Sequence, residues 1–304
     1  MKIFMTGGSG FVGTYLSRKL ALQGYDVTIL TRREPPPAPS HARISFLVGN
    51  PTREGPWMAE VKEHDWLINL AGASIFTRWT HKIKQEIHDS RIHTTQNLVK
   101  ALADGDGRQL LCSTSAIGYY GPRGEEALTE ESAPGSDFLA ELAQQWEAEA
   151  LKARELGVRV VITRFGIVLG RDGGALGQMA PMFKKFLGGP VGSGQQWFSW
   201  IHQADHARAF LFIKDHPELA GPVNLTSPNP VRNRELARAL GRALHRPSLM
   251  PAPAFMLRLI LGEFADVVLT GQKVLPRKLL DAGFQFHYPA IDRALKHLLG
   301  SEKS

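Results

Sequence analysis

The chain of 304 residues has very little cysteine, and Cys112 is its only one. A single cysteine excludes an internal disulfide and a metal site built on cysteines, so we expect no metal centre. It also fits a reducing compartment, and we expect a cytoplasmic protein.

Long apolar runs are missing as well. No stretch approaches the roughly 20 apolar residues that span a bilayer. No cationic start followed by an apolar run precedes the first expected strand. We therefore expect neither a signal peptide nor a membrane partner.

Acidic residues are outnumbered, since 36 Lys and Arg against 29 Asp and Glu give a formal net charge of +7. The basic residues are scattered, without a long Lys/Arg run or a nucleic-acid motif, so we expect no nucleic-acid partner. The positive balance favours anionic small molecules, above all phosphorylated ligands.

Strand and helix patterns alternate over the first half of the chain. Short apolar runs such as KIFMT, YDVTILT and QLLCSTS predict buried strands, and segments with apolar residues at helical spacing lie between them. The alternation predicts an α/β fold of the Rossmann type with a doubly wound parallel sheet. Glycine-rich loops and shorter elements follow. We therefore divide the chain into a sheet domain, 1–170, and a smaller mixed C-terminal lobe, 171–304, with interleaved segments.

The glycine-rich stretch TGGSGFVG occupies residues 6–13, between the first expected strand and the first expected helix. It fits G-x-G-x-x-G and equally T-G-x-x-G-x-x-G, the latter through Gly7, Gly10 and Gly13. In this setting glycines let the backbone approach a pyrophosphate at the positive end of the helix, which opens with Phe11 and Val12. The stretch predicts a dinucleotide-binding loop. The alternative is a tight turn that holds no ligand.

The end of the second expected strand selects the cofactor. NAD-binding proteins usually carry Asp or Glu there, whereas this chain has Thr31, Arg32 and Arg33, with Glu34 just beyond. An arginine can stack on adenine and pair with a 2′-phosphate. We therefore expect NADP (NADPH). Ordinary surface charge is the alternative for both arginines.

Eight stretches together resemble one superfamily. They are TGGSGFVG (6–13), NLAGASI (69–75), SRIHTTQNLVKA (90–101), STSAIGYYG (113–121), DFLAELAQQWE (137–147), RFGIVLGRDGGAL (164–176), GGPVGSGQQWFSWIHQADHARA (188–209) and LTGQKVLPRKLLDAGFQF (269–286). The chain resembles the extended and atypical short-chain dehydrogenase/reductases. Within them it is similar to the NAD-dependent epimerase/dehydratase-like subgroup of bacterial epimerase family proteins with a C-terminal extension.

The resemblance implies further cofactor contacts. Leu70, Ala71 and Gly72 would pass the adenosine ribose and the pyrophosphate, unless they form only a strand-exit turn. Arg91, together with Glu86 five residues earlier, would lie along the cofactor groove. The alternative is that the two residues form an exposed pair on the helix surface.

Three other positions follow from the same resemblance. Ser113 would lie beside the cofactor, and Val168 would contact the nicotinamide. The stretch WIHQADHA would border a nucleotide-sugar site, with a cap of the following helix as the alternative role for Asp205.

The chain departs from the superfamily in its expected proton-transfer helix. The usual tyrosine and the lysine four residues later are replaced by Phe138 and Leu142 in DFLAELAQQWE. Neither side chain can transfer a proton, and hydride transfer to a carbonyl needs a proton donor. The catalytic candidates that remain are Ser115, Tyr119 and Tyr120. Ser113 and Thr114 are the adjacent alternatives to Ser115, and core packing is the alternative for both tyrosines.

On the same helix, Glu141 and Glu147 are expected to be solvated. Two functions stay open. The first is an NADP-dependent oxidoreductase or epimerase acting on a nucleotide-sugar or similar small molecule. The second is a non-catalytic NADP-binding sensor or scaffold, which the missing pair favours. The sequence leaves the oligomeric state undecided.

Overall fold

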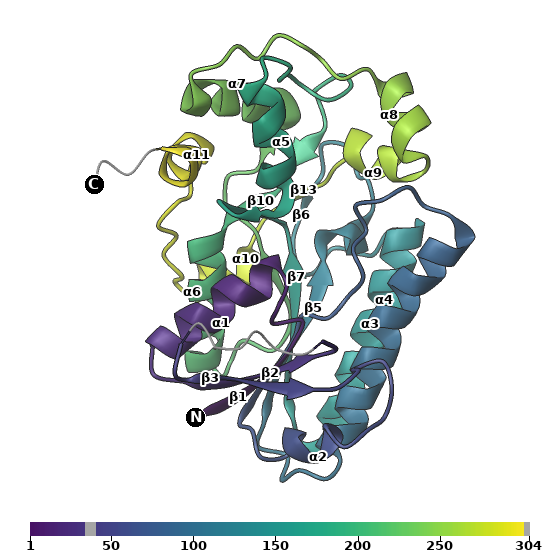
Figure 1. The fold of residues 1–304 in the computed structure, drawn as a ribbon, viewed down its shortest axis with the longest axis vertical. Helices are drawn as coiled ribbons and strands as arrows, with labels where there is room; N and C mark the ends of the chain where they lie inside the picture. The colour runs from purple at the N-terminus through teal and green to yellow at the C-terminus, as the bar shows by residue number, and fades with distance from the viewer. Residues whose placement is uncertain (34–40, 301–304) are drawn as a thin grey trace.

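A computed structural model of the protein describes residues 1–33 and 41–300. Its centre is a parallel sheet of seven strands in the order β11-β7-β5-β4-β1-β2-β3 (Figure 1). The strands are β1 (Lys2–Thr6), β2 (Asp26–Thr31), β3 (Ile44–Val48), β4 (Trp66–Asn69), β5 (Leu110–Ala116), β7 (Arg159–Phe165) and β11 (Gly221–Leu225). The chain changes direction across the sheet between β1 and β4, where open sheets of this kind bind ligands.

Helices cover both faces of this sheet, as Figure 1 shows. On one face lie α2 (Met58–Val61), α3 (His81–Leu102) and α4 (Phe138–Leu151), and on the other α1 (Phe11–Leu22), α6 (Gln203–Asp215) and α10 (Arg277–Asp281). Each set contributes apolar side chains to a buried cluster with the strands, such as Leu98 against Phe4 on one face and Phe210 near Ile3 on the other. Fully buried strands such as WLIN need this two-sided cover.

The C-terminal lobe stands over the carboxyl edge of the sheet. It has its own apolar cluster, centred on Trp200, Phe183 and Leu236. Its elements are β8 (Ile167–Gly170) with β10 (Trp200–His202), β9 (Trp197–Phe198) with β12 (Val231–Arg232), β6 (Ala127–Leu128) with β13 (Lys273–Val274), α5 (Gly174–Lys184), α7 (Asn233–Leu244), α8 (Ala254–Leu261), α9 (Phe264–Leu269) and α11 (Ile291–Leu299). Two 3-10 helices belong to the sheet domain, Ile117–Tyr120 directly after β5 and Lys152–Leu156 between α4 and β7.

The predicted Rossmann-type α/β fold is confirmed. The mostly apolar stretch VRVVITRFGIVLG (158–170) does not form one continuous strand, because β7 ends at Phe165 and β8 leaves the sheet to pair with β10. The break is at Gly166, where an added Cβ would lie 2.8 Å from Cγ2 of Thr226 and 2.9 Å from the oxygen of Ser199. Only glycine permits such a close approach.

The division into two domains at residue 170 stays an interpretation. The strand β11 follows that boundary in sequence but pairs with β7 in the main sheet. Within residues 1–33 and 41–300, no helix is both long and apolar enough to cross a membrane. In the same part of the chain, no three His, Cys, Asp or Glu side chains are grouped to hold a metal ion.

Candidate functional site

The glycine loop joins β1 to α1 through a tight turn. Gly7 has a φ of 67°, and a Cβ at this position would lie 2.6 Å from the carbonyl carbon of Leu70. A Cβ on Gly13 would lie 2.4 Å from the oxygen of Gly7. The protein's own backbone therefore excludes a side chain at Gly7 and Gly13, with or without a ligand.

Gly10 differs, because the protein leaves open space beside it. A Cβ there would meet only the oxygen of Gly7, at 3.3 Å. Gly10 is also the N-cap of α1, without a side-chain cap, and the first turn, which begins with Phe11 and Val12, contains no acidic residue. Free N–H groups at a helix start bind phosphate, so the loop has the shape and polarity that a pyrophosphate needs.

The turn after β2 presents two arginines. The hydroxyl of Thr31 donates to the carbonyl oxygen of Arg33 (3.2 Å) and accepts from its N–H (3.3 Å). This local turn leaves the side chains of Arg32 and Arg33 exposed at the carboxyl end of the strand. No carboxylate takes the strand-end position, and Glu34 lies outside the described residues.

Beside the glycine loop, the turn after β4 lies over a partly buried arginine. A Cβ on Gly72 would lie 3.0 Å from Cζ of Arg91, whose guanidinium donates to the carbonyl oxygens of Ala73 (3.1 Å) and Ile87 (3.0 Å). Burial lowers the pKa of Arg91 to about 10, so it stays charged at neutral pH. This cation adds positive potential beneath the turn.

The neighbouring predicted residues occupy less distinctive positions. Ala71 donates its N–H to the hydroxyl of Thr6 at 3.3 Å. Leu70 is half-buried against the core of the sheet. Glu86 is exposed on α3, and in the described part of the chain no hydrogen bond joins it to Arg91.

A buried polar cluster lies directly under these turns. Asn69 accepts a hydrogen bond from the hydroxyl of Thr6 (2.8 Å) and donates to the hydroxyls of Thr95 (2.9 Å) and Ser113 (3.3 Å). The indole N–H of Trp146 also donates to Thr95 (2.9 Å). Ser113 is 1% exposed. Its hydroxyl faces this cluster, which fixes the ends of β1, β4 and β5 relative to one another.

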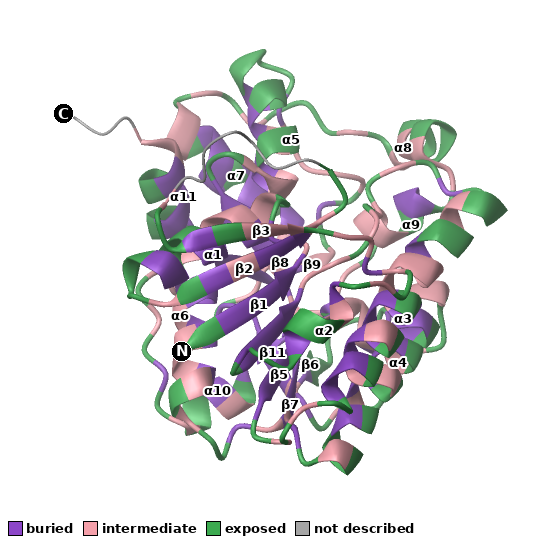
Figure 2. Ribbon diagram, turned by 60° about the horizontal axis from the view of Figure 1, so that its bottom comes forward, coloured by how far each residue is buried: buried purple, intermediate pink, exposed green. Residues whose placement is uncertain are grey.

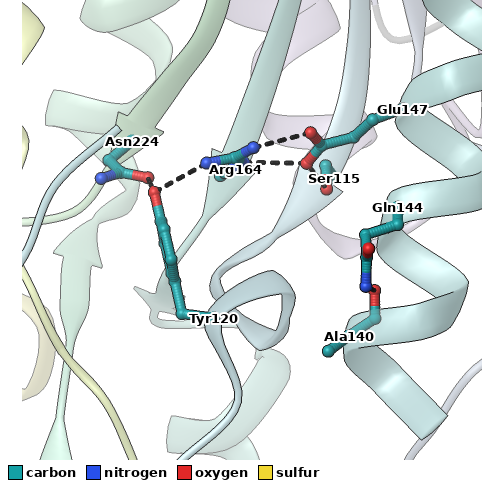
Figure 3. Close-up of polar contacts among 7 residues, drawn as sticks. All are labelled: Ser115, Tyr120, Ala140, Gln144, Glu147, Arg164 and Asn224. Atoms are coloured by element: carbon teal, nitrogen blue, oxygen red, sulfur yellow. Dashed lines mark hydrogen bonds and ion pairs between the residues drawn. The ribbon is translucent and has the colours of Figure 1, made fainter. Parts of the chain in front are cut away.

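A second buried cluster lies past the end of β5 (Figure 3). The Ser115 hydroxyl donates to Oε1 of Glu147 (2.6 Å), and the Arg164 guanidinium donates to both Glu147 oxygens (2.8 and 2.7 Å). Another Arg164 nitrogen donates to the Tyr120 hydroxyl (2.9 Å), which in turn donates to Oδ1 of Asn224 (2.7 Å). These five residues are all buried.

The electrostatics of this cluster hold its charges in place. Burial opposes the charge of Arg164, but the hydrogen bonds and negative charge of Glu147 outweigh it, and the pKa of Arg164 is raised. Burial is also the main cause that raises the pKa of Tyr120 to about 12. The expectation that Glu147 is solvated is therefore wrong, because α4 turns it inward toward Arg164.

The three catalytic candidates thus differ in their surroundings. The hydroxyls of Ser115 and Tyr120 are both engaged inside the protein. Tyr119 is half-buried, and its hydroxyl makes no hydrogen bond to any described residue. The ring of Tyr119 lies flat against the guanidinium of Arg164, with Cζ 3.5 Å from the ring centroid.

The positions of the missing proton-transfer pair are filled by apolar contacts. Phe138 packs edge-on against Trp79, and Leu142 is buried in the same cluster with Phe264 of α9. The spacing Tyr-x-x-x-Lys does occur once, at Tyr15 and Lys19. It lies on α1, where burial raises the pKa of Tyr15 and Lys19 is exposed. This arrangement is unlike the usual pair.

Val168, in β8, lies beside the first turn of α1. It lines a small pocket together with Phe11, Val12, Tyr15, Gln203 and His206. The alternative role of Asp205 as a helix cap is wrong, because His202 is the N-cap of α6 and accepts from the N–H of Ala204 (3.0 Å). Asp205 instead accepts from the backbone N–H groups of residues 287 and 288, both at 2.8 Å.

Sequence reasoning missed Arg164 and Asn224, which complete the second cluster. Each lies in a strand of mostly apolar residues, RVVITRF and GPVNL. A polar residue inside a buried strand is unusual and needs a hydrogen-bond partner, so the sequence does indicate that both residues have buried partners. The identity of the partner could not be read, because Glu147 and Tyr120 lie on other elements.

The glycine cradle at the β1–α1 turn and the ligand-binding edge of a doubly wound sheet define a dinucleotide-binding α/β protein. The model of the NAD dependent epimerase/dehydratase family matches residues 3–225, and a domain of unknown function, DUF1731, matches residues 252–298. The chain belongs to the NAD dependent epimerase/dehydratase family.

Similar proteins span nearly the whole chain. The epimerase family protein SDR39U1 homolog, chloroplastic, of Arabidopsis thaliana is 40% identical over 98% of this chain and 87% of its own length. The crystal structure of human epimerase family protein SDR39U1 (isoform2) with NADPH is 32% identical to this chain and has a TM-score of 0.87. The match covers 99% of this chain and 100% of the human one. The nucleoside-diphosphate sugar epimerase from Corynebacterium glutamicum is 31% identical, with a TM-score of 0.79 over 99% of this chain and 58% of that chain.

Proposed function

We propose that the protein binds NADP(H) and acts as an oxidoreductase or epimerase on a nucleotide-sugar or similar small molecule. The observation that carries the cofactor choice is the end of β2, where Arg32 and Arg33 stand exposed in place of a carboxylate. A carboxylate there would repel a 2′-phosphate, whereas a guanidinium can pair with it. The NADPH in the human relative's structure supports the same choice.

Each part of the cofactor has residues suited to it. Gly7, Gly10 and Gly13, with the N–H groups of Phe11 and Val12, would hold the pyrophosphate. Thr31, Arg32 and Arg33 would hold the adenosine with its 2′-phosphate. Leu70, Ala71 and Gly72 would line the ribose, with Arg91 and Glu86 along the groove, and Ser113 and Val168 would lie toward the nicotinamide. When bound, the nicotinamide supplies hydride transfer.

Titration of the purified protein with NADPH and NADH tests the cofactor assignment. In the parent, NADPH should bind more tightly. Replacing Arg32 with alanine removes a charge-assisted hydrogen bond to the phosphate, so NADPH affinity should fall roughly 10- to 100-fold while NADH affinity stays unchanged.

Arg108→Ala is the matched control, because Arg108 is an exposed arginine just before β5, at the opposite edge of the sheet. It should leave both affinities unchanged. Equal binding of the two cofactors, unaltered by Arg32→Ala, would remove the NADP assignment.

For the chemistry, we propose that Tyr119 donates the proton to the substrate oxygen. Its hydroxyl makes no hydrogen bond to a described residue, and the contact with the Arg164 guanidinium fixes the position of its ring. Ser115 and Tyr120 would support the site through Glu147 and Arg164. The Corynebacterium relative's name, a nucleoside-diphosphate sugar epimerase, supports the substrate class.

Tyr119→Phe tests this role with NADPH oxidation followed across a panel of nucleotide-sugars and simple ketones. Turnover should fall by about 10²- to 10⁴-fold, with NADPH affinity kept. Tyr120→Phe should lower turnover less, because it acts through Arg164. If both variants turn over like the parent, neither tyrosine takes part in the proton transfer.

The apolar cluster around Phe138 and Leu142 favours a second candidate, an NADP-binding sensor or scaffold without turnover. Under that function NADPH binds with the Arg32 dependence above, but no panel substrate is consumed. For location, the single cysteine fits the cytoplasm, whereas the Arabidopsis relative is named chloroplastic. Direct measurement of mass in solution would give the oligomeric state.

A further inference from the structure

One end of the C-terminal lobe carries most of the protein's exposed large apolar side chains. Of the fourteen in the described residues, nine fall within two short segments, 182–187 and 249–260. They are Met182, Phe186, Leu187, Leu249, Met250, Phe255, Met256, Leu259 and Ile260. The helix α8 has no buried residue at all, and Figure 2 shows it in exposed and intermediate colours along its length.

The two segments form one surface, which we name the apical face and define as residues 182–191 and 238–261. The N–H of Met250 donates to the oxygen of Gly188 (3.1 Å), and that of Ala252 donates to the oxygen of Pro190 (2.9 Å). The connection from α7 to α8 runs along this end of the molecule, at the top of Figure 1. These bonds place the start of the second segment beside the end of the first.

The apical face is also cationic. Residues 173–204 and 236–262 contain no Asp or Glu, yet they include Lys184, Lys185, Arg238, Arg242, Arg246 and Arg258. Two of these arginines pair with carboxylates of neighbouring elements, Arg242 with Asp292 (2.6 Å) and Arg258 with Asp266 (3.2 Å). Four basic side chains, those of Arg238, Arg242, His245 and Arg246, line an open hollow of about 600 Å³ with Ser248 and Leu249.

Two polar atoms in this hollow have no partner within the described residues, Nε of Arg246 and Oγ of Ser248, although both are buried. Buried donors are rarely left unpaired. Nearby, Phe186 holds a φ of 63° with its ring exposed beside the Arg246 guanidinium (4.7 Å). The conformation ends α5, because the N–H of Phe186 donates to the oxygen of Phe183 and that of Leu187 to the oxygen of Met182, both at 2.9 Å.

We propose that the apical face docks on the surface of an anionic phospholipid bilayer. Phe255, Leu259 and Leu249 enter the interfacial layer, and the arginines of the hollow take headgroup phosphates. A bilayer offers phosphate above an apolar layer, which matches cations flanking protruding apolar side chains. A two-fold pairing with a second copy fits poorly, because it would set this predominantly basic face against itself. Surface docking needs no spanning segment.

Co-sedimentation with vesicles tests the proposal on the full chain without cofactor, so it is independent of the proposed function. We expect binding to vesicles of equal phosphatidylcholine and phosphatidylglycerol, weak binding to pure phosphatidylcholine, and loss of binding at high salt. No binding to the anionic vesicles at low salt overturns the proposal.

Two pairs of variants separate the apolar and the charged contributions. Phe255→Ser with Leu259→Ser should weaken binding at least about tenfold. Leu22→Ser with Leu280→Ser, also exposed but elsewhere, is the control. Because α8 buries no residue and Leu22 and Leu280 are exposed, both pairs of variants should keep the parent's melting temperature.

Lys185→Glu with Arg238→Glu should weaken binding more than about tenfold, at about fivefold for each charge lost near the surface. Arg18→Glu with Arg108→Glu changes the net charge equally at exposed sites away from the face and should have a much smaller effect.

Three other outcomes also overturn the proposal. Soluble glycerol phosphate could bind the hollow while vesicles do not, which would show a free-phosphate site. Phe255→Ser with Leu259→Ser could convert a dimer to a monomer without altering vesicle binding. Polyglutamate could bind as tightly as the vesicles with no sensitivity to the apolar pair, which would indicate an acidic protein partner.

Discussion

The turns after β1 and β5 lie on the same edge of the sheet but are built differently. After β1 the shape comes from backbone alone, because Gly7 and Gly13 leave no space for a side chain while the first turn of α1 keeps its N–H groups free. After β5 the shape comes from side chains, because Ser115 and Tyr120 are tied to buried partners.

The contrast explains how the two halves tolerate change. A backbone cradle binds phosphate through groups that every residue carries, so it depends on glycine and little else. A side-chain cluster depends on each partner, because removing one leaves another buried polar group unpaired. The following changes test this difference, starting with the largest effect that we expect.

Glu147→Ala should be the most damaging substitution in the second cluster. It leaves the buried Arg164 guanidinium without its negative partner and the Ser115 hydroxyl without an acceptor. Removing one member of a buried ion pair costs about 3–5 kcal/mol of unfolding free energy. Urea denaturation, followed by circular dichroism, measures this loss.

Two comparisons make the Glu147 result specific. Glu147→Leu combined with Arg164→Met removes both charges, so it should destabilise less than the single variant. Lys100→Ala breaks an exposed pair with Glu54 and should cost less than about 1 kcal/mol. A Glu147→Ala loss as small as that of Lys100→Ala would show that the buried pair contributes little.

The glycine loop should respond to position rather than to charge. In Gly13→Ala the new methyl group meets the oxygen of Gly7 at 2.4 Å, and backbone on both sides prevents relief, so we expect a loss of about 2–3 kcal/mol in urea denaturation. In Gly10→Ala the methyl group meets one atom at 3.3 Å, so the loss should stay below about 1 kcal/mol.

NADPH binding separates these two glycines further. The Gly10→Ala methyl group occupies the space left for the pyrophosphate, so affinity should fall at least about tenfold although the fold is kept. If Gly10→Ala binds NADPH like the parent, the cradle does not hold the pyrophosphate at this position.

Much of the fold could be predicted from local pattern. Apolar strands such as WLIN and the helical spacing of 81–102 give element type directly, and right-handed connections then order the sheet. The division of 158–170 could not be predicted, because it depends on Thr226 and Ser199 approaching Gly166 from distant parts of the chain.

The candidate site divides along the same line. Gly7, Gly10 and Gly13 are neighbours in sequence, so their joint pattern predicts a cradle. Glu147 and Arg164 come from α4 and β7, and nothing in the sequence near either residue identifies its partner. The helical periodicity of α4 does not distinguish the inward Glu147 from the exposed Glu141, because the sequence does not show which side of the helix faces the sheet.

The remaining expected effect is a pH dependence of the free energy of unfolding, which arises on the cofactor side of the site. His206 is buried in the pocket with Val168, its ring edge-on to Phe165 at 4.3 Å, and burial lowers its pKa to about 3. In the unfolded chain the pKa is about 6.5. The unfolded state therefore takes up a proton that the folded state refuses, and the stability gained above pH 6.5 is lost as the pH falls toward 3.

At pH 5 this single group should lower the unfolding free energy by about 2 kcal/mol relative to pH 7.5. His206→Leu keeps an apolar group in the pocket and should flatten the slope by that amount, measured by urea denaturation at both pH values. His202, whose pKa burial also lowers to about 3, remains in the variant, so some slope should persist. His93→Gln, on the exposed side of α3, should keep the parent's slope. An unchanged slope in His206→Leu would mean that water or a proton reaches His206 in the folded state. The interior beside Val168 would then be as accessible to solvent as the glycine loop.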